Sequence, residues 1–149
     1  MHFVGSHPRT LDPKGRLMLP PAFRDVLLAR SQDGEFVMTT HDGCVTAFAK
    51  PDWEEMLDSI SSLPLPPRRV RDFRRLVVGG MQLVSLDKQG RVLMAQSLCD
   101  YAGLGKDVIL VGQGHLFEVW SQERLDAVRN QDFDDVVEDL TKLGGKFPF

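Results

Sequence analysis

The sequence predicts an α+β protein with a mainly β core, in which two copies of one hairpin-rich unit interleave to close a single barrel-like core. The stretch LDPKGRLMLP at residues 11–20 returns as LDKQGRVLMA at residues 86–95, with the shared Asp, Gly and Arg at a constant offset of 75. Residues 36–53 then align with residues 108–125 at an offset of 72, each with two apolar runs around a glycine-containing turn. Since a half of about 70 residues buries too little apolar surface to fold comfortably alone, we expect an intramolecular pseudo-dimer with flanking helices.

Each unit begins with a strand, a tight turn and a second strand. In the first turn Asp12 occupies position i, Pro13 position i+1 and Gly15 position i+3. A type I turn favours this order, because proline presets φ and the Asp carboxylate can bond its own backbone. The second turn, from Asp87 to Gly90, keeps the aspartate and the glycine and lacks the proline. We therefore expect the same hairpin at both places.

Helical segments follow the hairpins. Residues 20–21, both proline, precede the segment AFRDVLLAR, and residues 95–97 precede LCDYAGL, which we expect Gly103 to end. Residues 51–61 begin with proline and acidic residues, which are typical of a helix N-terminus. Residues 66–78 predict an arginine-rich helix that ends at two glycines.

The C-terminal part predicts one acidic helical region over residues 121–143, followed by GGKFPF at residues 144–149 as a frayed or partner-bound end. Three aromatic side chains with apolar neighbours are expected to anchor the core rather than to serve as stacking platforms: Trp53, Phe73 and Trp120.

The composition is that of a soluble globular protein, with 42% hydrophobic and 26% charged residues among 149. No apolar run approaches the roughly 18–20 residues that a membrane span needs, and the start MHFVGSHPRT has no signal-peptide pattern. Two cysteines, Cys44 and Cys99, do not suggest a disulfide scaffold. We expect a cytoplasmic protein.

The net charge of −3 does not exclude a nucleic-acid partner, because the charges are unevenly distributed. Residues 1–31 carry five basic and two acidic side chains, a balance of +3. Residues 123–139 carry seven acidic and two basic side chains, a balance of −5. The basic residues thus lie near the first hairpin and the acidic residues lie in the tail.

Enzymatic chemistry has little support. The sequence has no glycine-rich phosphate loop with its lysine, no HExxH motif and no pair of CxxC motifs. His41 and Cys44 have a spacing that could hold a metal, but the aligned positions in the second unit are Gln113 and Leu116, and two ligands do not close a zinc site. We predict neither a catalytic residue nor a bound metal or cofactor.

The charged turns have two interpretations. Asp12 and Arg16 flank the first turn as Asp87 and Arg91 flank the second, so each pair could be an ion pair that braces its turn. Alternatively, the aspartates orient arginines whose planar donor forks bind phosphate or guanine edges. Repetition supports the second interpretation, because two basic tips related by a pseudo-two-fold axis can follow one groove of DNA.

The arginine-rich helix also has more than one interpretation. Its five arginines, balanced by one aspartate only, could simply form a solvated face. They could instead contact the DNA backbone or dock against the acidic tail of a neighbouring subunit. The tail supplies the complementary charges: Asp132, Asp134, Asp135, Glu138 and Asp139.

Taken together, the duplicated D-x-x-G-R hairpin, the segment RRVRDFRRLVVGG and the run LVGQGHLFEVWS resemble the MraZ family of bacterial transcriptional regulators. The resemblance spans residues 3–129 and is specific because the motif occurs twice at the right separation. It implies a tandem of swapped-hairpin units of the AbrB type, packed as an intrachain pseudo-dimer. It also implies ring-shaped homo-oligomers that bind short direct repeats in the protein's own promoter, at the start of the division and cell-wall gene cluster, and repress it.

In this family the D-x-x-x-R arginines are the positions tied to DNA binding, and here they fall on Arg16 and Arg91. From their charge and position, four basic neighbours are also expected to contact DNA: Lys14, Lys88, Arg9 and Arg24. The remaining motif residues are expected to shape the turns: Asp12, Gly15, Asp87 and Gly90. The expected partners are double-stranded DNA and further copies of the chain, with no membrane and no small-molecule substrate, in the cytoplasm and on the nucleoid. The alternative is a ring-forming structural protein that binds other proteins.

The expected organisation has four parts: a first repeat over residues 3–60, an arginine-rich connecting helix over 61–80, a second repeat over 81–128 and an acidic tail over 129–149.

Overall fold

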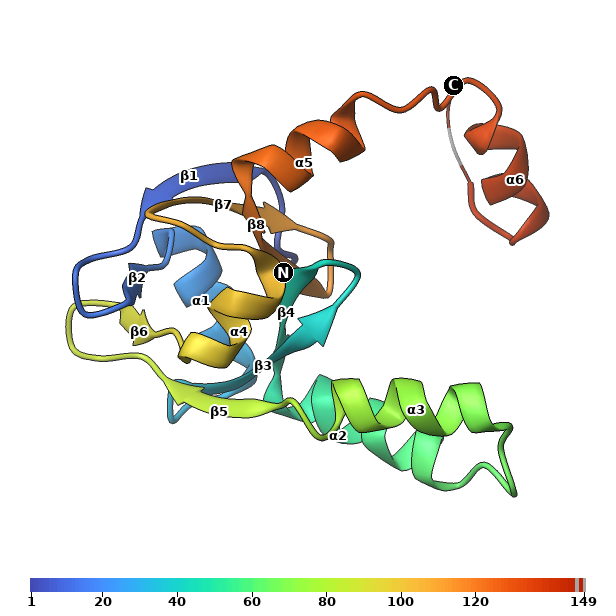
Figure 1. The fold of residues 1–149 in the computed structure, drawn as a ribbon, viewed down its shortest axis with the longest axis horizontal. Coiled ribbons are helices and arrows are strands. Elements are labelled where there is room, and N and C mark those ends of the chain that lie inside the picture. The colour runs from blue at the N-terminus through green and yellow to red at the C-terminus, as the bar shows by residue number, and fades with distance from the viewer. Residues whose placement is uncertain (147, 149) are drawn as a thin grey trace.

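The structure is a computed structural model that describes residues 1–146 and 148. Two residues of the predicted C-terminal end, 147 and 149, lie outside the described residues. Eight strands and six helices follow one another along the described chain (Figure 1): β1 (Ser6–Thr10), β2 (Arg16–Met18), α1 (Pro21–Arg30), β3 (Glu35–His41), β4 (Cys44–Ala49), α2 (Lys50–Ser61), α3 (Arg68–Val77), β5 (Gln82–Ser85), β6 (Arg91–Leu93), α4 (Gln96–Ala102), β7 (Asp107–Gly112), β8 (Leu116–Ser121), α5 (Gln122–Arg129) and α6 (Val136–Lys142).

The strands form a six-stranded antiparallel sheet and a separate two-stranded ribbon. The order of the large sheet is β1-β7-β8-β4-β3-β5, and the ribbon pairs β2 with β6. Exchanging each strand for its counterpart in the other half (β1 for β5, β3 for β7, β4 for β8) returns the same order read backwards. Pairings β1–β7, β3–β5, β4–β8 and β2–β6 all join one half to the other, so neither half can complete the sheet alone.

The predicted closed barrel is wrong. Among the described strands, β1 and β5 are the two edges of an open sheet, and no ladder joins one edge to the other. The reason is that β2 and β6 have only three residues each and pair with each other. Two backbone bonds at the ends of this ribbon, from Leu19 N to Gly90 O at 3.1 Å and from Met94 N to Gly15 O at 2.9 Å, tie each strand to the opposite turn.

One hydrophobic core serves both halves. Phe117 of β8 lies 5.1 Å, between ring centroids, from both Phe3 and Phe23, and 6.0 Å from Phe36. These four rings are fully buried or nearly so. The core extends beneath the ribbon, where Leu17 of β2 and Val92 of β6 belong to the same buried cluster. The mainly β core that the sequence predicts is therefore shared, as a pseudo-dimer requires.

The helix boundaries agree with the predictions except at the C-terminus. Gly103 ends α4 with φ +64°, as predicted, because glycine adopts this left-handed conformation without steric cost. The predicted single helix over residues 121–143 is instead α5 and α6. Between them the carboxylate of Asp132 accepts a bond from the backbone N–H of Asp134 at 2.9 Å, and such local bonds compete with the helix.

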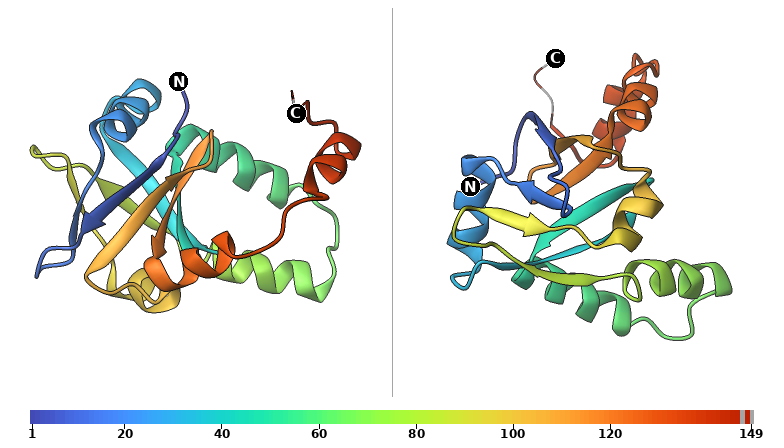
Figure 2. Two further views of the ribbon diagram at one scale, coloured as in Figure 1. Left: turned by 90° about the horizontal axis from the view of Figure 1, so that it is seen from above. Right: turned by 60° about the vertical axis from the view of Figure 1, so that its left-hand side comes forward.

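Two of the three predicted core aromatics are buried, Trp53 and Trp120, whereas Phe73 is 46% exposed. The prediction for Phe73 is wrong because α3 buries only its last residue, Val77. Thr39 of β3 donates a hydrogen bond to the carbonyl of Val77, so α3 is held to the sheet at one end. The α2–α3 hairpin (residues 50–77) therefore projects from the body (Figure 2).

Within the part of the chain that the structure describes, no helix has both the length and the apolar character needed to cross a membrane.

Candidate nucleic-acid interface

The β2–β6 ribbon lies at the opposite end of the molecule from the α2–α3 hairpin and α6 (Figure 1). Its register pairs Arg16 with Leu93 and Met18 with Arg91 on either side of the central Leu17–Val92 pair. Side chains alternate between the faces of a strand, and the central pair is buried. The other four side chains therefore share the outer face. The ribbon presents two arginines and two exposed apolar residues related by the pseudo-two-fold axis.

The first turn is built around the carboxylate of Asp12. The backbone N–H of Gly15 donates to the carbonyl of Asp12 at 2.9 Å, which closes the predicted turn, and Gly15 has φ +82°. Oδ1 of Asp12 accepts bonds from the backbone N–H of Lys14 at 2.9 Å and of Arg16 at 2.8 Å. Oδ2 accepts a bond from Nε of Arg16 at 2.6 Å. One carboxylate thus shapes the backbone and holds the arginine.

The second turn repeats this arrangement bond for bond. The N–H of Gly90 donates to the carbonyl of Asp87 at 3.0 Å, and Gly90 also has φ +82°. Oδ1 of Asp87 accepts bonds from the N–H groups of Gln89 and Arg91, both at 2.9 Å. Oδ2 accepts a bond from Nε of Arg91 at 2.9 Å. The predicted equivalence of the two turns is confirmed in its geometry.

The two interpretations of the charged turns describe one arrangement. Each ion pair braces its turn, and each uses only Nε of its arginine for the charged contact. Among the described residues, the terminal nitrogens of Arg16 have no acceptor, while Nη2 of Arg91 donates a long bond to Oε1 of Gln89 at 3.4 Å. The arginine side chains are 33% and 28% exposed. Their outward nitrogens remain able to bind an acceptor from solution.

The structure brings some of the predicted basic neighbours to the ribbon. Lys14 and Lys88 lie in the exposed tips of the two turns. Arg24 of α1 packs on the second turn, so closely that a Cβ added to Gly90 would lie 2.5 Å from Nη1 of Arg24. Arg9 lies in edge strand β1, where its Nη1 donates to the adjacent carbonyl of Pro8 at 2.7 Å, and among the described residues it makes no hydrogen bond or ion pair with the ribbon.

The first turn borders a groove of about 730 Å³ in which a basic residue outside the predicted set, Lys106, lies with Lys14. The carbonyl of Lys106 accepts a bond from the N–H of Leu11 at 2.8 Å, since β1 pairs with β7 of the other half. No local sequence signal reveals this neighbour. At the pseudo-equivalent position of Arg24 the second half has Cys99, which also lines this groove. The two turns thus differ in their surroundings.

The carboxyl groups of the turns should titrate at unusually acid pH. The backbone N–H of Arg16 lowers the pKa of Asp12 below 3.8, and the N–H of Arg91 does the same to the pKa of Asp87, against opposing desolvation. Because these pKa values are lower in the folded than in the unfolded state, the carboxylates stabilise the turns above pH 3.8. This stabilisation is lost as the pH falls through the folded-state values.

We expect the amide NMR signals of Lys14 and Gln89 to titrate with midpoints below 3.8. In the Asp12→Asn variant the signal of Lys14 should lose this transition while that of Gln89 keeps it. Midpoints at or above 3.8 would show that the backbone donors do not stabilise the carboxylates.

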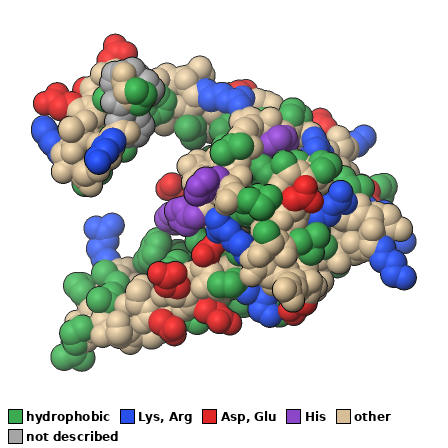
Figure 3. All heavy atoms as spheres, turned by 180° about the vertical axis from the view of Figure 1, so that it is seen from behind, with side chains coloured by type: hydrophobic (Ala, Val, Ile, Leu, Met, Phe, Trp, Pro, Cys, Tyr) green, Lys and Arg blue, Asp and Glu red, His purple; other side chains and the backbone are tan. Residues whose placement is uncertain are grey.

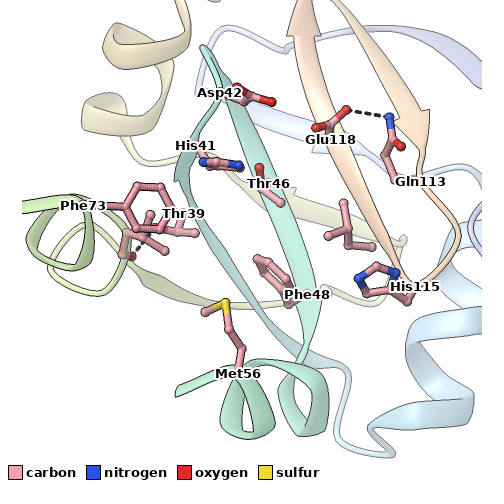
Figure 4. A pocket seen from close by; sticks show the side chains of 12 residues that line it. Thr39, His41, Asp42, Thr46, Phe48, Met56, Phe73, Gln113, His115 and Glu118 are labelled. Carbon is pink, nitrogen blue, oxygen red and sulfur yellow. Dashed lines mark hydrogen bonds between the residues drawn. The ribbon is translucent and has the colours of Figure 1, made fainter. Parts of the chain in front are cut away.

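A second cavity, of about 390 Å³, lies between the α2–α3 hairpin and the outer face of β3, β4 and β8 (Figure 4). Phe48, Met56 and Phe73 line its apolar side. On its polar side Oε1 of Glu118 accepts bonds from Nε2 of Gln113 at 3.1 Å and from Nε1 of Trp120 at 3.0 Å. The carboxylate of Glu118 is therefore already hydrogen-bonded to other side chains of the protein.

The His41–Cys44 spacing does not produce a pair of metal ligands. The thiol of Cys44 is buried and donates to the carbonyl of His41 at 3.2 Å, and burial strongly raises its pKa. The imidazole of His41 packs edge-on against Phe73, with 5.5 Å between ring centroids. In the described part of the chain, no three His, Cys, Asp or Glu side chains are grouped so that they could hold a metal ion.

The fold and its ribbon define a duplicated α+β protein whose halves each contribute one Asp-anchored arginine to a shared two-stranded surface. The sequence matches one protein family twice, over residues 2–76 and 77–141, and the family's description is "MraZ protein, putative antitoxin-like". The chain belongs to the MraZ family.

Curated relatives match the chain over nearly its whole length. A protein of Nitratidesulfovibrio vulgaris strain Hildenborough is 55% identical over 149 residues, which cover 100% of both chains. A protein of Oleidesulfovibrio alaskensis is 50% identical over 148 residues, 99% of both chains. A more distant protein of Leuconostoc citreum is 38% identical over 143 residues, 93% of this chain and 96% of its own. Each of these relatives is named "Transcriptional regulator MraZ".

Proposed function

We propose that this chain is a sequence-specific DNA-binding transcriptional regulator whose β2–β6 ribbon contacts DNA. The observation that carries the proposal is the ribbon's outer face, where Arg16 and Arg91 are each held at Nε by an aspartate and keep terminal nitrogens available. The names of the relatives support a role in transcription. More specifically, we propose that the protein is a repressor that occupies its own promoter, ahead of division and cell-wall genes, on the chromosome in the cytoplasm.

The ribbon suits a DNA groove in size and chemistry. A two-stranded ribbon fits the major groove, and diagonal neighbours across a ladder lie about 7–8 Å apart, the relation of Arg16 to Arg91. A guanidinium can bind phosphate oxygens or the O6 and N7 atoms of guanine with two parallel bonds. Met18 and Leu93, 41% and 60% exposed, are available for apolar contact with thymine methyl groups.

The proposed architecture is a tandem of swapped-hairpin units of the AbrB type, and strand pairing between the halves supports it. Its proposed parts are the repeats at 3–60 and 81–128, the connecting helix at 61–80 and the acidic tail at 129–149. Several copies in a ring would each engage one direct repeat of the operator. Weak single contacts then become strong through effective concentration.

The proposal is tested by titrating the protein, by fluorescence anisotropy, with a duplex carrying its own upstream region and with a scrambled duplex, each at two salt concentrations. We expect tight binding to the upstream duplex alone, weakened steeply by salt because phosphate contacts release counterions. Equal weak binding to both duplexes would overturn the proposal.

Replacing the anchoring aspartates gives a test in which charge and geometry predict opposite results. Removing a negative charge from a DNA-binding face should strengthen binding if only charge matters. We expect Asp12→Ala/Asp87→Ala to bind the upstream duplex about 2–10-fold more weakly per arginine, because each guanidinium loses its fixed orientation. Stronger binding than the wild type would show that the aspartates do not position the arginines.

The alternative function, a ring-forming protein that binds other proteins, is favoured by one observation. Large apolar side chains are exposed on the α2–α3 hairpin, far from the ribbon, including Leu65 at 98% and Leu76 at 63%. If DNA binding fails in the titration, this surface is where partners should be sought.

A further inference from the structure

Two protruding parts of the chain carry opposite charge. The first is the α2–α3 hairpin, whose helix α3 has five arginines and one aspartate, a net charge of +4. The second is the C-terminal arm (residues 130–146), in which five acids and one lysine precede residue 143, a net charge of −4 up to that point. Figure 3 shows both projecting from the same side of the body with open space between them.

The basic surface is only partly neutralised within the chain. Asp72 pairs with Arg75 at 2.7 Å and, more loosely, with Arg68 at 3.5 Å. Among the described residues, Arg69 has no hydrogen-bond acceptor and no ion-pair partner. Helical spacing places it on one stripe with Leu76, seven residues further along. The exposed face of α3 thus combines uncompensated positive charge with an apolar side chain that is 63% exposed.

The arm has the complementary pattern. Asp135, which precedes α6, and Asp139 within it lie four residues apart, so they form an acidic stripe along one side of the helix, and neither has an ion-pair partner among the described residues. The adjacent stripe is apolar and consists of Val136, Leu140 and Leu143, of which Leu143 is 84% exposed. Acidic and apolar stripes thus run side by side on α6, as basic and apolar residues do on α3.

We propose that the C-terminal arm of one copy docks on the exposed face of α3 in a second copy of this chain. Apolar side chains of α6 cover Leu76 and its exposed neighbours, while Asp135 and Asp139 neutralise the arginines. The occupant is a second copy because the complementary surfaces occur together on every chain and, within the described residues, no ion pair joins them in one chain. This inference rests on the proposed assembly of several copies on repeated DNA.

Charge exchange tests the contact directly. In the arm-reversed variant Asp135→Lys/Asp139→Lys and in the helix-reversed variant Arg69→Glu/Arg75→Glu, like charges face each other. We expect each variant alone to lose the assembled mass that light scattering measures for the wild type. An equimolar mixture of the two should regain it, because every arm then meets a helix of opposite charge. The matched control is Asp25→Lys/Glu123→Lys, which reverses two exposed carboxylates outside the α2–α3 hairpin and the arm and should assemble normally.

The other outcomes overturn the proposal. Unchanged assembly of both single variants would show that the arm and α3 do not meet. Restoration only when both reversals are in one chain, and not in the mixture, would show that the arm folds back on its own α3. A disulfide test is independent of the reversals: Leu76→Cys and Leu143→Cys chains, mixed and oxidised, should form a crosslinked heterodimer, and its absence would contradict the contact.

DNA binding separates this inference from the proposed function. The arm-reversed variant keeps its ribbon, so we expect it to bind a single repeat within about twofold of the wild type. On a duplex with several repeats it should bind about 100-fold more weakly, since avidity is lost. If the arm-reversed variant also lost binding to a single repeat, its weaker binding to several repeats would not be due to the lost docking contact, and this would count against the inference. Normal assembly of the wild type without any DNA binding would count against the proposed function alone.

Discussion

The double variant Arg16→Ala/Arg91→Ala is expected to bind its upstream duplex at least about 30-fold more weakly than the wild type. A bidentate arginine–guanine contact contributes about 1–3 kcal/mol, and the ribbon carries two such arginines. If the arginines contact phosphates instead, binding to every sequence should weaken, and the slope of log affinity against log salt should fall by about one per arginine. Fluorescence anisotropy at several salt concentrations distinguishes the two cases.

Two controls show whether the loss belongs to the ribbon. Arg129→Ala removes an arginine from the end of α5 and should change affinity little. Arg16→Lys/Arg91→Lys keeps the charge without the planar fork, so it should retain general attraction and lose discrimination between the upstream and scrambled duplexes. Unchanged affinity in the alanine double variant, with the fold intact by circular dichroism, would exclude the ribbon as the DNA contact.

Phe117→Ala is expected to lower the free energy of unfolding by about 3–5 kcal/mol, the range for deleting a large buried ring. Phe117 comes from the second half of the chain, and its ring lies against Phe3, Phe23 and Phe36 of the first half. The cavity would therefore open between the halves, where neither can repack alone. Because the halves share this core, chemical denaturation should show one transition for the wild type and one for the variant.

The matched control is Phe133→Ala, which removes a ring that is 50% exposed on the C-terminal arm and should change stability by less than about 0.5 kcal/mol. Two separate unfolding transitions, with only one shifted by Phe117→Ala, would show that the halves are independent domains.

Repetition made much of this fold predictable. Two aspartate–glycine turns at a constant offset predict two equivalent hairpins, and the bonds to Asp12 and Asp87 match each other. Local chemistry also predicts helix ends well where one residue decides them, as Gly103 does. Arg16 and Arg91 could be chosen from the sequence because each stands at a fixed distance from its aspartate.

Properties that depend on pairing between distant strands could not be predicted in this way. Nothing near Lys106 shows that β7 will lie beside β1, and nothing near Gly90 shows that Arg24 will cover it. The open sheet has the same origin, because the lengths of β2 and β6 decide whether the edges can be joined. Phe73 has the pattern of a core residue, yet Val77 is the residue of α3 that is buried, and Phe73 only packs against His41 at the end of β3.

The central claim is that both turns of the ribbon contact DNA at once, and hydrogen–deuterium exchange with and without the upstream duplex tests it most directly. The account predicts that DNA slows exchange in the peptides covering residues 11–18 and 86–93, and that the two slow together as DNA is added. Protection confined to α3, or equal in the presence of a scrambled duplex, would contradict the claim and place the DNA contact elsewhere.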